Sequence, residues 1–161
     1  MAFDGHLKLG TLSGESAVKG FEAQIQISSL SFGVTNTGTT HNATGGGAGK
    51  SNVSDITFTH HIDSASPNLY LSCCNGTHFD KATFTLRKTG GDALVYCTID
   101  LTDMIISSCF WSGGAGEELI TETVSINFTS INISYQAQDN KGAAKGGKVV
   151  AGWNAATNAK L

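Results

Sequence analysis

One segment of the chain has nearly the spacing of a phosphate-binding loop. Residues 44–51 read TGGGAGKS, one residue away from the pattern G-x-x-x-x-G-K-[ST], in which backbone N–H groups and a lysine surround phosphate oxygens. The first position is Thr44 instead of glycine, and the residues after Ser51 do not follow a helical pattern. Without a helix N-terminus the loop lacks the partial positive charge that holds a phosphate. We therefore interpret the segment as a contact surface and not as a nucleotide site.

A pair of neighbouring histidines is the second candidate for chemistry, because histidine is a common metal ligand. His60 and His61 follow Ile56 and Phe58 in a segment where apolar and polar residues alternate. Such alternation is typical of a strand, in which adjacent side chains point to opposite faces and cannot readily share one metal ion. His60 has the apolar phase, so we expect it to be a buried or partly buried histidine. The sequence predicts no metal site.

The carboxylates do not form a recognisable acid–base pair. Asp55 and Asp63 have no acidic partner in the sequence, and Glu117, Glu118 and Glu122 are interpreted as a solvated face. Neither G-x-S-x-G nor H-E-x-x-H occurs, so the usual spacings of a serine nucleophile and of a zinc protease are missing. We predict no catalytic residue and no cofactor, and therefore a protein that is not an enzyme.

Length and charge restrict the remaining function classes. The chain has 161 residues, which predicts a single domain, residues 1–161, with a substantial core. Its formal net charge is -3, with 10 Lys and Arg against 13 Asp and Glu and no basic run, which argues against nucleic-acid binding. No apolar run approaches the roughly 18 residues of a membrane span. Residues 1–10 alternate like a mature strand and lack the pattern of a signal peptide.

Strand patterns dominate, and two of them change phase in the middle. Apolar residues occupy odd positions over 21–27 and even positions over 30–34, with Ser28 and Ser29 at the change. The same change recurs at Thr129 and Ser130. A one-residue slip turns the apolar face outwards unless the strand bulges or bends there. Two kinked long strands favour a mainly β fold, either a small closed β-barrel or a two-sheet β-sandwich.

The other predicted elements are shorter. Strands are expected at residues 54–63, 82–88, 93–106 and 149–153, with a hairpin turn at 89–92. One flanking α-helix is predicted, with Ser66 as its N-cap, Pro67 in its first position and Gly76 as its C-terminal stop.

Residues 37–53 are predicted to form an extended loop of about 17 residues, which is longer than the usual connection in a compact domain. Two readings stay open for this loop. It is either a disordered insert or a segment that a neighbouring subunit orders.

Several blocks of residues, in their order and spacing, identify a family. They extend nearly from end to end and comprise residues 14–16 (GES), 31–33 (SFG), 45–50 (GGGAGK), 55–63 followed by 66–69, 83–88 with 90–91, and 122–128 with Tyr135. Through them the chain resembles the haemolysin-coregulated proteins (Hcp), which form the inner tube of bacterial type VI secretion systems.

The resemblance implies a compact β-barrel of two sheets with one helix, assembled into six-membered rings. The rings stack into a tube that a contractile sheath expels, and effector proteins are carried in the lumen. The implied partners are other copies of the chain, effectors, and the sheath and spike components. The protein would reside in the bacterial cytoplasm before assembly and be secreted without a cleaved signal peptide.

The resemblance also implies roles for particular residues. The ring-stacking loop would reach the adjacent ring, and it comprises Gly45, Gly46, Gly47, Ala48, Gly49 and Lys50. Ser31 would lie on a strand that faces the lumen and its effectors. Leu30 stands where many relatives have an aromatic residue.

Two other function classes remain as alternatives. The loops rich in Thr, Asn and Gly are compatible with a monomeric secreted carbohydrate-binding or adhesive β-sandwich. Such a module would have the mass of one chain in solution and would bind glycans. An enzyme would lose turnover on His60→Ala or Asp55→Ala.

Overall fold

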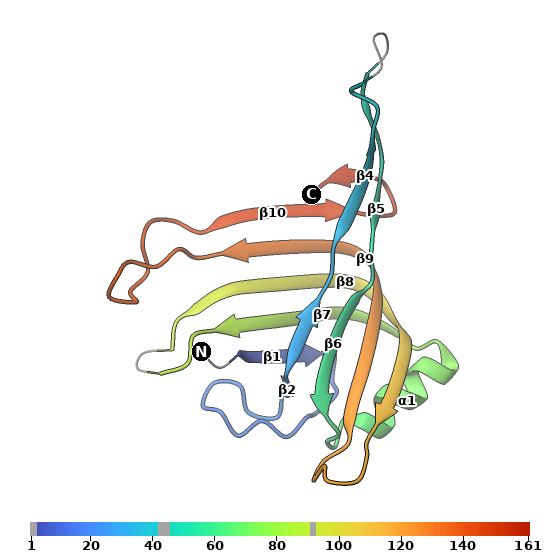
Figure 1. The fold of residues 1–161 in the computed structure, drawn as a ribbon, viewed down its shortest axis with the longest axis vertical. Coiled ribbons are helices and arrows are strands. Elements are labelled where there is room, and N and C mark those ends of the chain that lie inside the picture. The colour runs from blue at the N-terminus through green and yellow to red at the C-terminus, as the bar shows by residue number, and fades with distance from the viewer. Residues whose placement is uncertain (1–2, 42–45, 91–92) are drawn as a thin grey trace.

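The computed structural model describes residues 3–41, 46–90 and 93–161. Over these residues the fold is mainly β with one short helix, as predicted (Figure 1). The elements, in chain order, are β1 (Asp4–Leu9), β2 (Ile25–Ile27), β3 (Ser29–Ser31), β4 (Val34–Gly38), β5 (Ala48–Val53), β6 (Ile56–His61), α1 (Ser66–Asn75), β7 (His78–Arg87), β8 (Val95–Ser112), β9 (Thr121–Tyr135), β10 (Val149–Asn154) and β11 (Ala159–Lys160).

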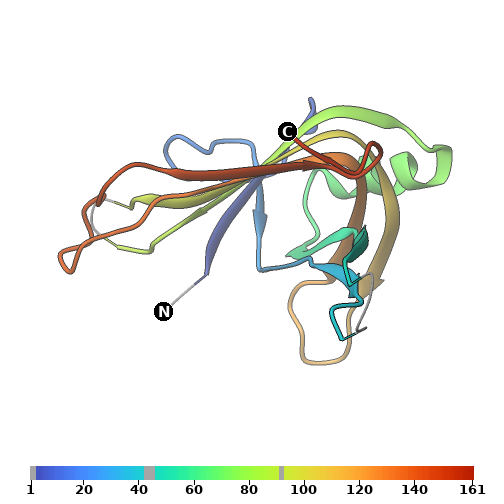
Figure 2. The same ribbon diagram turned by 90° about the horizontal axis from the view of Figure 1, so that it is seen from above.

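Most strands belong to one antiparallel sheet. Its main path runs β11-β10-β9-β8-β7-β1-β2, and β6 joins it by pairing with β9, while β3 pairs with β6. The first half of β9 pairs with β6 and its second half with β10, so one long strand serves two neighbours in succession. Figure 2 shows the long strands β8 and β9 curving out of the layer that they form with β7 and β10. The closed barrel of the sequence prediction is not confirmed, because β2 and β3 are separate short strands with different partners.

The predicted phase change at Ser28 marks the point where the chain changes partner. β2 pairs with β1 and β3 pairs with β6, and the Ser28 N–H between them donates to the Thr59 carbonyl at 2.7 Å. At the second predicted change β9 stays continuous. Opposite it on β8, Asp103 has a left-handed backbone (φ 48°), and its carboxylate accepts a hydrogen bond from Thr129.

The apolar core lies on the inner face of the curved sheet and extends under α1. Its fully or almost fully buried side chains come from strands on both sides of the curve and from the helix, and they include Leu7, Leu9, Ile56, Phe58, Leu69, Phe84, Ile99, Leu101 and Ile126. Apart from Leu69 of the helix, these residues have the two-residue period of their strands, so much of the core was visible as a pattern in the sequence.

Helix α1 begins differently from the prediction. Its N-cap is Ala65, and no side chain caps the helix, so the assignment of Ser66 as N-cap is wrong. The Ser66 hydroxyl accepts from the Asp63 N–H at 3.0 Å and donates to Glu122 at 2.7 Å. The Ser66 hydroxyl, which was expected to cap the helix, therefore bonds to Glu122 of β9 instead. Gly76 at the left-handed C-terminal position (φ 67°) is confirmed, whereas Pro67 lies in the first turn one residue after the predicted first position.

The expected loop at residues 37–53 is instead largely a hairpin. β4 and β5 pair from Val34 with Val53 to Gly38 with Ala48, which forms a separate two-stranded sheet. Figure 1 shows this hairpin projecting beyond the body of the molecule. Every residue of β4 is exposed. The prediction failed here because the strands carry little apolar alternation and are held by backbone pairing.

Candidate assembly surfaces

The projecting hairpin is stabilised by its own hydrogen bonds. The Asn36 side-chain amide donates to the Gly49 carbonyl at 2.9 Å, and the Thr39 hydroxyl donates to the Gly47 carbonyl at 3.0 Å. At its base the Ser51 hydroxyl donates to Asn158 at 3.1 Å, which connects the hairpin to the turn between β10 and β11. The hairpin is therefore an ordered projection with mostly exposed side chains.

The predicted stacking segment lies on this hairpin. Gly46 and Gly47 precede β5, and Ala48, Gly49 and Lys50 are its first residues; all five are exposed. Gly45 lies outside the described residues. The segment is therefore free in the single chain to contact a neighbouring molecule, and its role in stacking stays a prediction.

An apolar hollow of about 400 Å³ lies at the base of the hairpin. It is lined almost entirely by apolar groups of the hairpin, of β9 and of β10, among them Phe32, Val34, Val53, Ile131, Ile133 and Trp153. Phe32 is 41% exposed and Val34 is 64% exposed, although their alternating pattern suggested an inward face. Contiguous exposed apolar surface of this kind marks a contact site.

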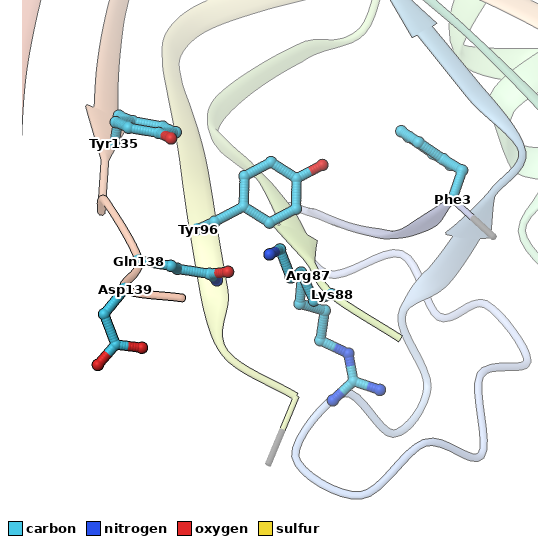
Figure 3. Close-up of a pocket in the computed structure, with 7 residues that line it drawn as sticks. All are labelled: Phe3, Arg87, Lys88, Tyr96, Tyr135, Gln138 and Asp139. Carbon is cyan, nitrogen blue, oxygen red and sulfur yellow. The ribbon is translucent and has the colours of Figure 1, made fainter. Parts of the chain in front are cut away.

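A second cavity, of about 520 Å³, lies where the ends of β7, β8 and β9 meet (Figure 3). Its lining mixes aromatic, basic and amide side chains, namely Phe3, Arg87, Lys88, Tyr96, Tyr135, Gln138 and Asp139. In Figure 3 the Tyr96 ring lies between the Gln138 carboxamide and Phe3, and the Arg87 guanidinium points away from it. Asp4 holds Arg87 through a 2.8 Å ion pair, and Phe21 contacts the guanidinium through its ring.

The Gln138 carboxamide gives this cavity a polar wall. Both its oxygen and its nitrogen are buried without a hydrogen-bond partner among the described residues. A carboxamide can pair with a backbone amide through one donor and one acceptor. The cavity is therefore suited to a polar segment of a neighbouring chain. Sequence reasoning missed it, because its lining comes from five separate stretches of the chain.

Ser31 belongs to a continuous face of hydroxyl side chains. It lies opposite Thr57 on β6, which in turn lies opposite Ser125 on β9. The Thr57 and Ser125 hydroxyls are 2.8 Å apart. The hydroxyl face is formed by Ser29, Ser31, Thr57, Thr59, Thr123 and Ser125. The register also places Phe110 of β8 opposite Thr123, where its ring is 68% exposed.

Strand β10 provides an edge of the main sheet that is covered only in part. β11 pairs with Trp153 and Asn154 alone, so the earlier residues of β10 have no partner on that side within the described sheet. Val149 and Val150 there are 69% and 57% exposed. An apolar strand edge offers both backbone hydrogen bonds and burial to another chain.

A fully buried polar group lies apart from these surfaces. Glu122 of β9 has no exposed surface and accepts four hydrogen bonds from β6, α1 and β8. Oε2 accepts from His60 Nε2 at 2.5 Å and from Ser66 Oγ at 2.7 Å. Oε1 accepts from Trp111 Nε1 at 2.7 Å and from Cys109 Sγ at 2.9 Å. We call these five residues the Glu122 cluster.

The hydrogen bonds determine the protonation of the cluster. Burial alone would raise the pKa of Glu122, but the bonds from His60, Cys109, Ser66 and Trp111 outweigh it and hold that pKa below its ordinary value. Burial, followed by the hydrogen bond to Glu122 and the charge of that group, raises the pKa of the Cys109 thiol to about 12. Glu122 is therefore a buried anion and Cys109 a protonated thiol near neutral pH.

This arrangement corrects one interpretation from the sequence and confirms another. Glu122 is not on a solvated face, although Glu117 and Glu118 are exposed as expected. His60 is buried, as its apolar phase predicted. The partners of Glu122 lie up to 62 positions away in sequence, so no local pattern could have indicated them.

Asp55 binds neighbouring side chains. Its carboxylate accepts from Ser107 at 2.6 Å and from Asn127 at 2.8 Å. It connects the start of β6 with β8 and β9, and among the described residues no hydrogen bond or ion pair joins it to a histidine. Within the described residues no three His, Cys, Asp or Glu side chains come together as a metal site. No helix in that part of the chain is long and apolar enough to cross a membrane.

Comparison with known proteins gives one consistent result. Residues 5–135 match the family model described as type VI secretion system effector, Hcp. The chain is 40% identical over 159 residues to Protein hcp1 of Pseudomonas aeruginosa, with 98% of each chain covered. It is also similar to a solved structure described as a type six secretion system protein, with a TM-score of 0.93, 29% identity, and 99% of this chain and 100% of that chain covered. For Hcp1 from Salmonella typhimurium the TM-score is 0.83 at 30% identity, and all of both chains is covered.

These matches define the class of protein as a mainly β component of type VI secretion. The chain belongs to the Hcp family. It is accordingly a secreted tube protein of a type VI secretion system, as the order of its sequence blocks predicted.

Proposed function

We propose that the protein acts as a single domain without enzymatic activity that assembles into hexameric rings, and that these rings stack into the tube. The sheath and spike of the secretion machine would be its further partners. The chain would wait in the cytoplasm and leave the cell as part of the expelled tube, without a cleaved signal peptide.

The projecting hairpin and the apolar hollow at its base carry this proposal. A monomer would keep an exposed, hydrogen-bonded projection next to Phe32 and Val34, whose apolar side chains remain in water. Ring and stack formation need two different complementary patches on each subunit, one for a contact that closes and one for a contact that propagates. The hollow and the β10 edge provide apolar surface for one of these contacts. The hairpin projects from the body and can make the other.

The hydroxyl face is the candidate lumen surface. It is uncharged and polar, with Ser31 exposed at one edge and the exposed Phe110 ring at the other. Such a surface offers hydrogen bonds and one apolar contact without a strong charge. It therefore suits cargo proteins of varied surface. We propose that effectors bind there and that Ser31 contacts them.

Native mass spectrometry with negative-stain electron microscopy tests the assembly. We expect a hexamer and annular particles from pure protein at neutral pH. A single-chain mass under all gentle conditions would overturn the proposal and would favour the monomeric carbohydrate-binding module, which glycan-array binding would then test.

Deletion of residues 45–49 tests the stacking role of the hairpin. The body should keep its circular dichroism spectrum and its hexamer mass, because the hairpin's sheet is separate from the main sheet. Stacked rings should become rarer in electron micrographs. Stacking at the wild-type level would remove these residues from the ring-to-ring contact.

Replacement of Ser31 by Arg tests the lumen. The variant should fold and form rings because Ser31 is exposed, but it should retain less effector on co-purification. Ser125→Arg offers a comparison two strands away on the same face. Full retention of effector by Ser31→Arg would remove this residue from the cargo site.

A further inference from the structure

Two aromatic rings form a partly exposed hollow between α1 and the end of β8. Tyr70 is 57% exposed and Trp111 is 47% exposed. Their ring centroids are 6.5 Å apart, and their planes meet at 65°. Together with Pro67 they line a hollow of about 320 Å³, which we call the aromatic platform.

A hydrogen bond to a buried carboxylate fixes the orientation of the Trp111 indole ring. Its indole N–H donates to the buried Glu122 carboxylate at 2.7 Å, and the three other donors of the Glu122 cluster fix that carboxylate. A hydrogen bond to an anion polarises the donor, so electron density in the indole ring increases. The Trp111 ring is therefore both oriented before binding and more attractive to a cation over its face.

The segments of the chain that carry the platform contain acidic residues but no Lys or Arg. Residues 51–80 and 89–140, which include α1 and the end of β8, contain no Lys or Arg. Trp111 also lines a neighbouring hollow of about 230 Å³, whose other walls include Glu117 and Glu118. Both carboxylates are exposed, so they impose a negative potential beside the aromatic rings. A cationic group would contact the aromatic ring faces and pair with the carboxylates at the same time.

We propose that the aromatic platform is a docking site for an arginine or lysine side chain presented by a protein partner. The cation would lie over the Trp111 face against Tyr70, and Glu117 and Glu118 would be the anionic rim. A proline-rich or purely apolar segment would use the rings but would leave these carboxylates without a counter-ion. The charge pattern therefore favours a basic segment.

The test uses two labelled hexapeptides and the intact assembled protein. One peptide alternates leucine and arginine, and the other has citrulline in place of arginine, which keeps the shape and removes the charge. Fluorescence anisotropy should show the arginine peptide binding roughly 5-fold or more tighter. Tyr70→Ala should weaken the arginine peptide roughly 2- to 5-fold, the size of an exposed cation–π contact. The double variant Glu117→Gln with Glu118→Gln should reduce the preference for arginine over citrulline.

Leu71→Ala is the matched control. Leu71 is adjacent to Tyr70 on α1 and is similarly exposed, at 56%, but it does not line the aromatic platform. This variant should bind the arginine peptide like the wild type. Tyr70→Ala is preferred to a change at Trp111, because Tyr70 makes no hydrogen bond that the fold needs among the described residues.

Three outcomes would overturn the proposal. The first is equal affinity for the two peptides, and the second is equal loss on Leu71→Ala and Tyr70→Ala. The third is loss of the hexamer in Tyr70→Ala by native mass, which would make the platform a contact between copies of this chain. A wild-type protein that stays monomeric would contradict the ring assembly and leave the peptide comparison valid.

Discussion

The projecting hairpin and the Glu122 cluster are both polar. The hydrogen bonds within the hairpin join residues that are close in sequence, whereas those of the cluster also join residues that are far apart in sequence. In the hairpin, Asn36 and Thr39 bond to backbone 13 and 8 positions away, and the side chains remain exposed. In the cluster, His60 and Ser66 bond to Glu122 from 62 and 56 positions away, and all three are buried. The hairpin can therefore change without disturbing the body, whereas the cluster joins α1 to the sheet.

Removal of the buried anion should have the largest effect on folding. Glu122→Ala leaves the buried donors of His60 and Ser66, and the half-buried donors of Cys109 and Trp111, without their acceptor. Each buried donor that loses its acceptor costs about 1–3 kcal/mol, so the loss from the buried His60 and Ser66 donors together is about 2–6 kcal/mol. Urea unfolding of the variant should show this loss, and Glu118→Ala, at an exposed site, should stay within about 0.5 kcal/mol of the wild type. Equal stabilities would show that the cluster does not hold the fold.

Loss of a single donor should be less severe. Trp111→Phe keeps the aromatic ring and removes the N–H that bonds to Glu122. A hydrogen bond to a charged group contributes about 1.5–3 kcal/mol, and partial exposure of Trp111 places the expected loss near the lower end. Phe110→Leu, one residue away on the opposite face, should change the unfolding free energy by less than about 0.5 kcal/mol. A larger loss of stability for Phe110→Leu than for Trp111→Phe would contradict the hydrogen bond between Trp111 and Glu122.

Acid should weaken the cluster and spare the hairpin. The folded-state pKa of Glu122 is lowered from 4.5, so the folded state binds this proton less readily than the unfolded state. Its contribution to stability is therefore complete above about pH 4.5 and is lost as the pH falls through the lowered folded-state value. Unfolding free energies measured from pH 7 to pH 3 should fall less steeply for Glu122→Gln. An unchanged slope would indicate that other carboxylates control acid unfolding.

The hairpin should give the smallest effect on folding and still change assembly. A Cβ at Gly49 would overlap the Thr37 hydroxyl and lie 2.9 Å from the Thr37 carbonyl, whereas a Cβ at Gly47 would meet nothing within 4 Å. Gly49→Ala should therefore distort the hairpin, reduce ring stacking, and change body stability by less than about 0.5 kcal/mol. Gly47→Ala is its control and should stack normally. Equal ring stacking by both variants would show that the geometry of the hairpin at Gly49 does not control assembly.

Much of the body was predictable from periodicity. The core residues Ile56, Phe58 and Ile126 follow the alternation of their strands, and Gly76 ends the helix where a left-handed residue was expected. The phase change at Ser28 lies at a real irregularity, although the chain forms two separate strands there and not the single kinked strand that was predicted. These features depend on neighbours in sequence, so local chemistry is sufficient to indicate them.

The sites were less predictable, because distant strands assemble them. The hydroxyl face combines alternate residues of β3, β6 and β9, and only the register between these strands shows that Ser31 and Ser125 share a surface. The cavity around Tyr96 likewise collects residues from both ends of the chain. The outward position of Phe32 and Val34 contradicted their pattern, since apolar alternation does not distinguish a core face from a face that a partner covers.

The sequence by itself determined the mainly β class, the position of the helix and the family. Strand periodicity and turn residues depend on neighbours in sequence, and the family depends on the order of its blocks along the chain. Only the tertiary structure decided that Glu122 is buried and that residues 48–53 form a hairpin strand. The physical reason is the same in both cases. A polar residue is exposed or buried according to the partners that folding brings to it, and those partners lie far from it in the sequence or contribute only backbone groups.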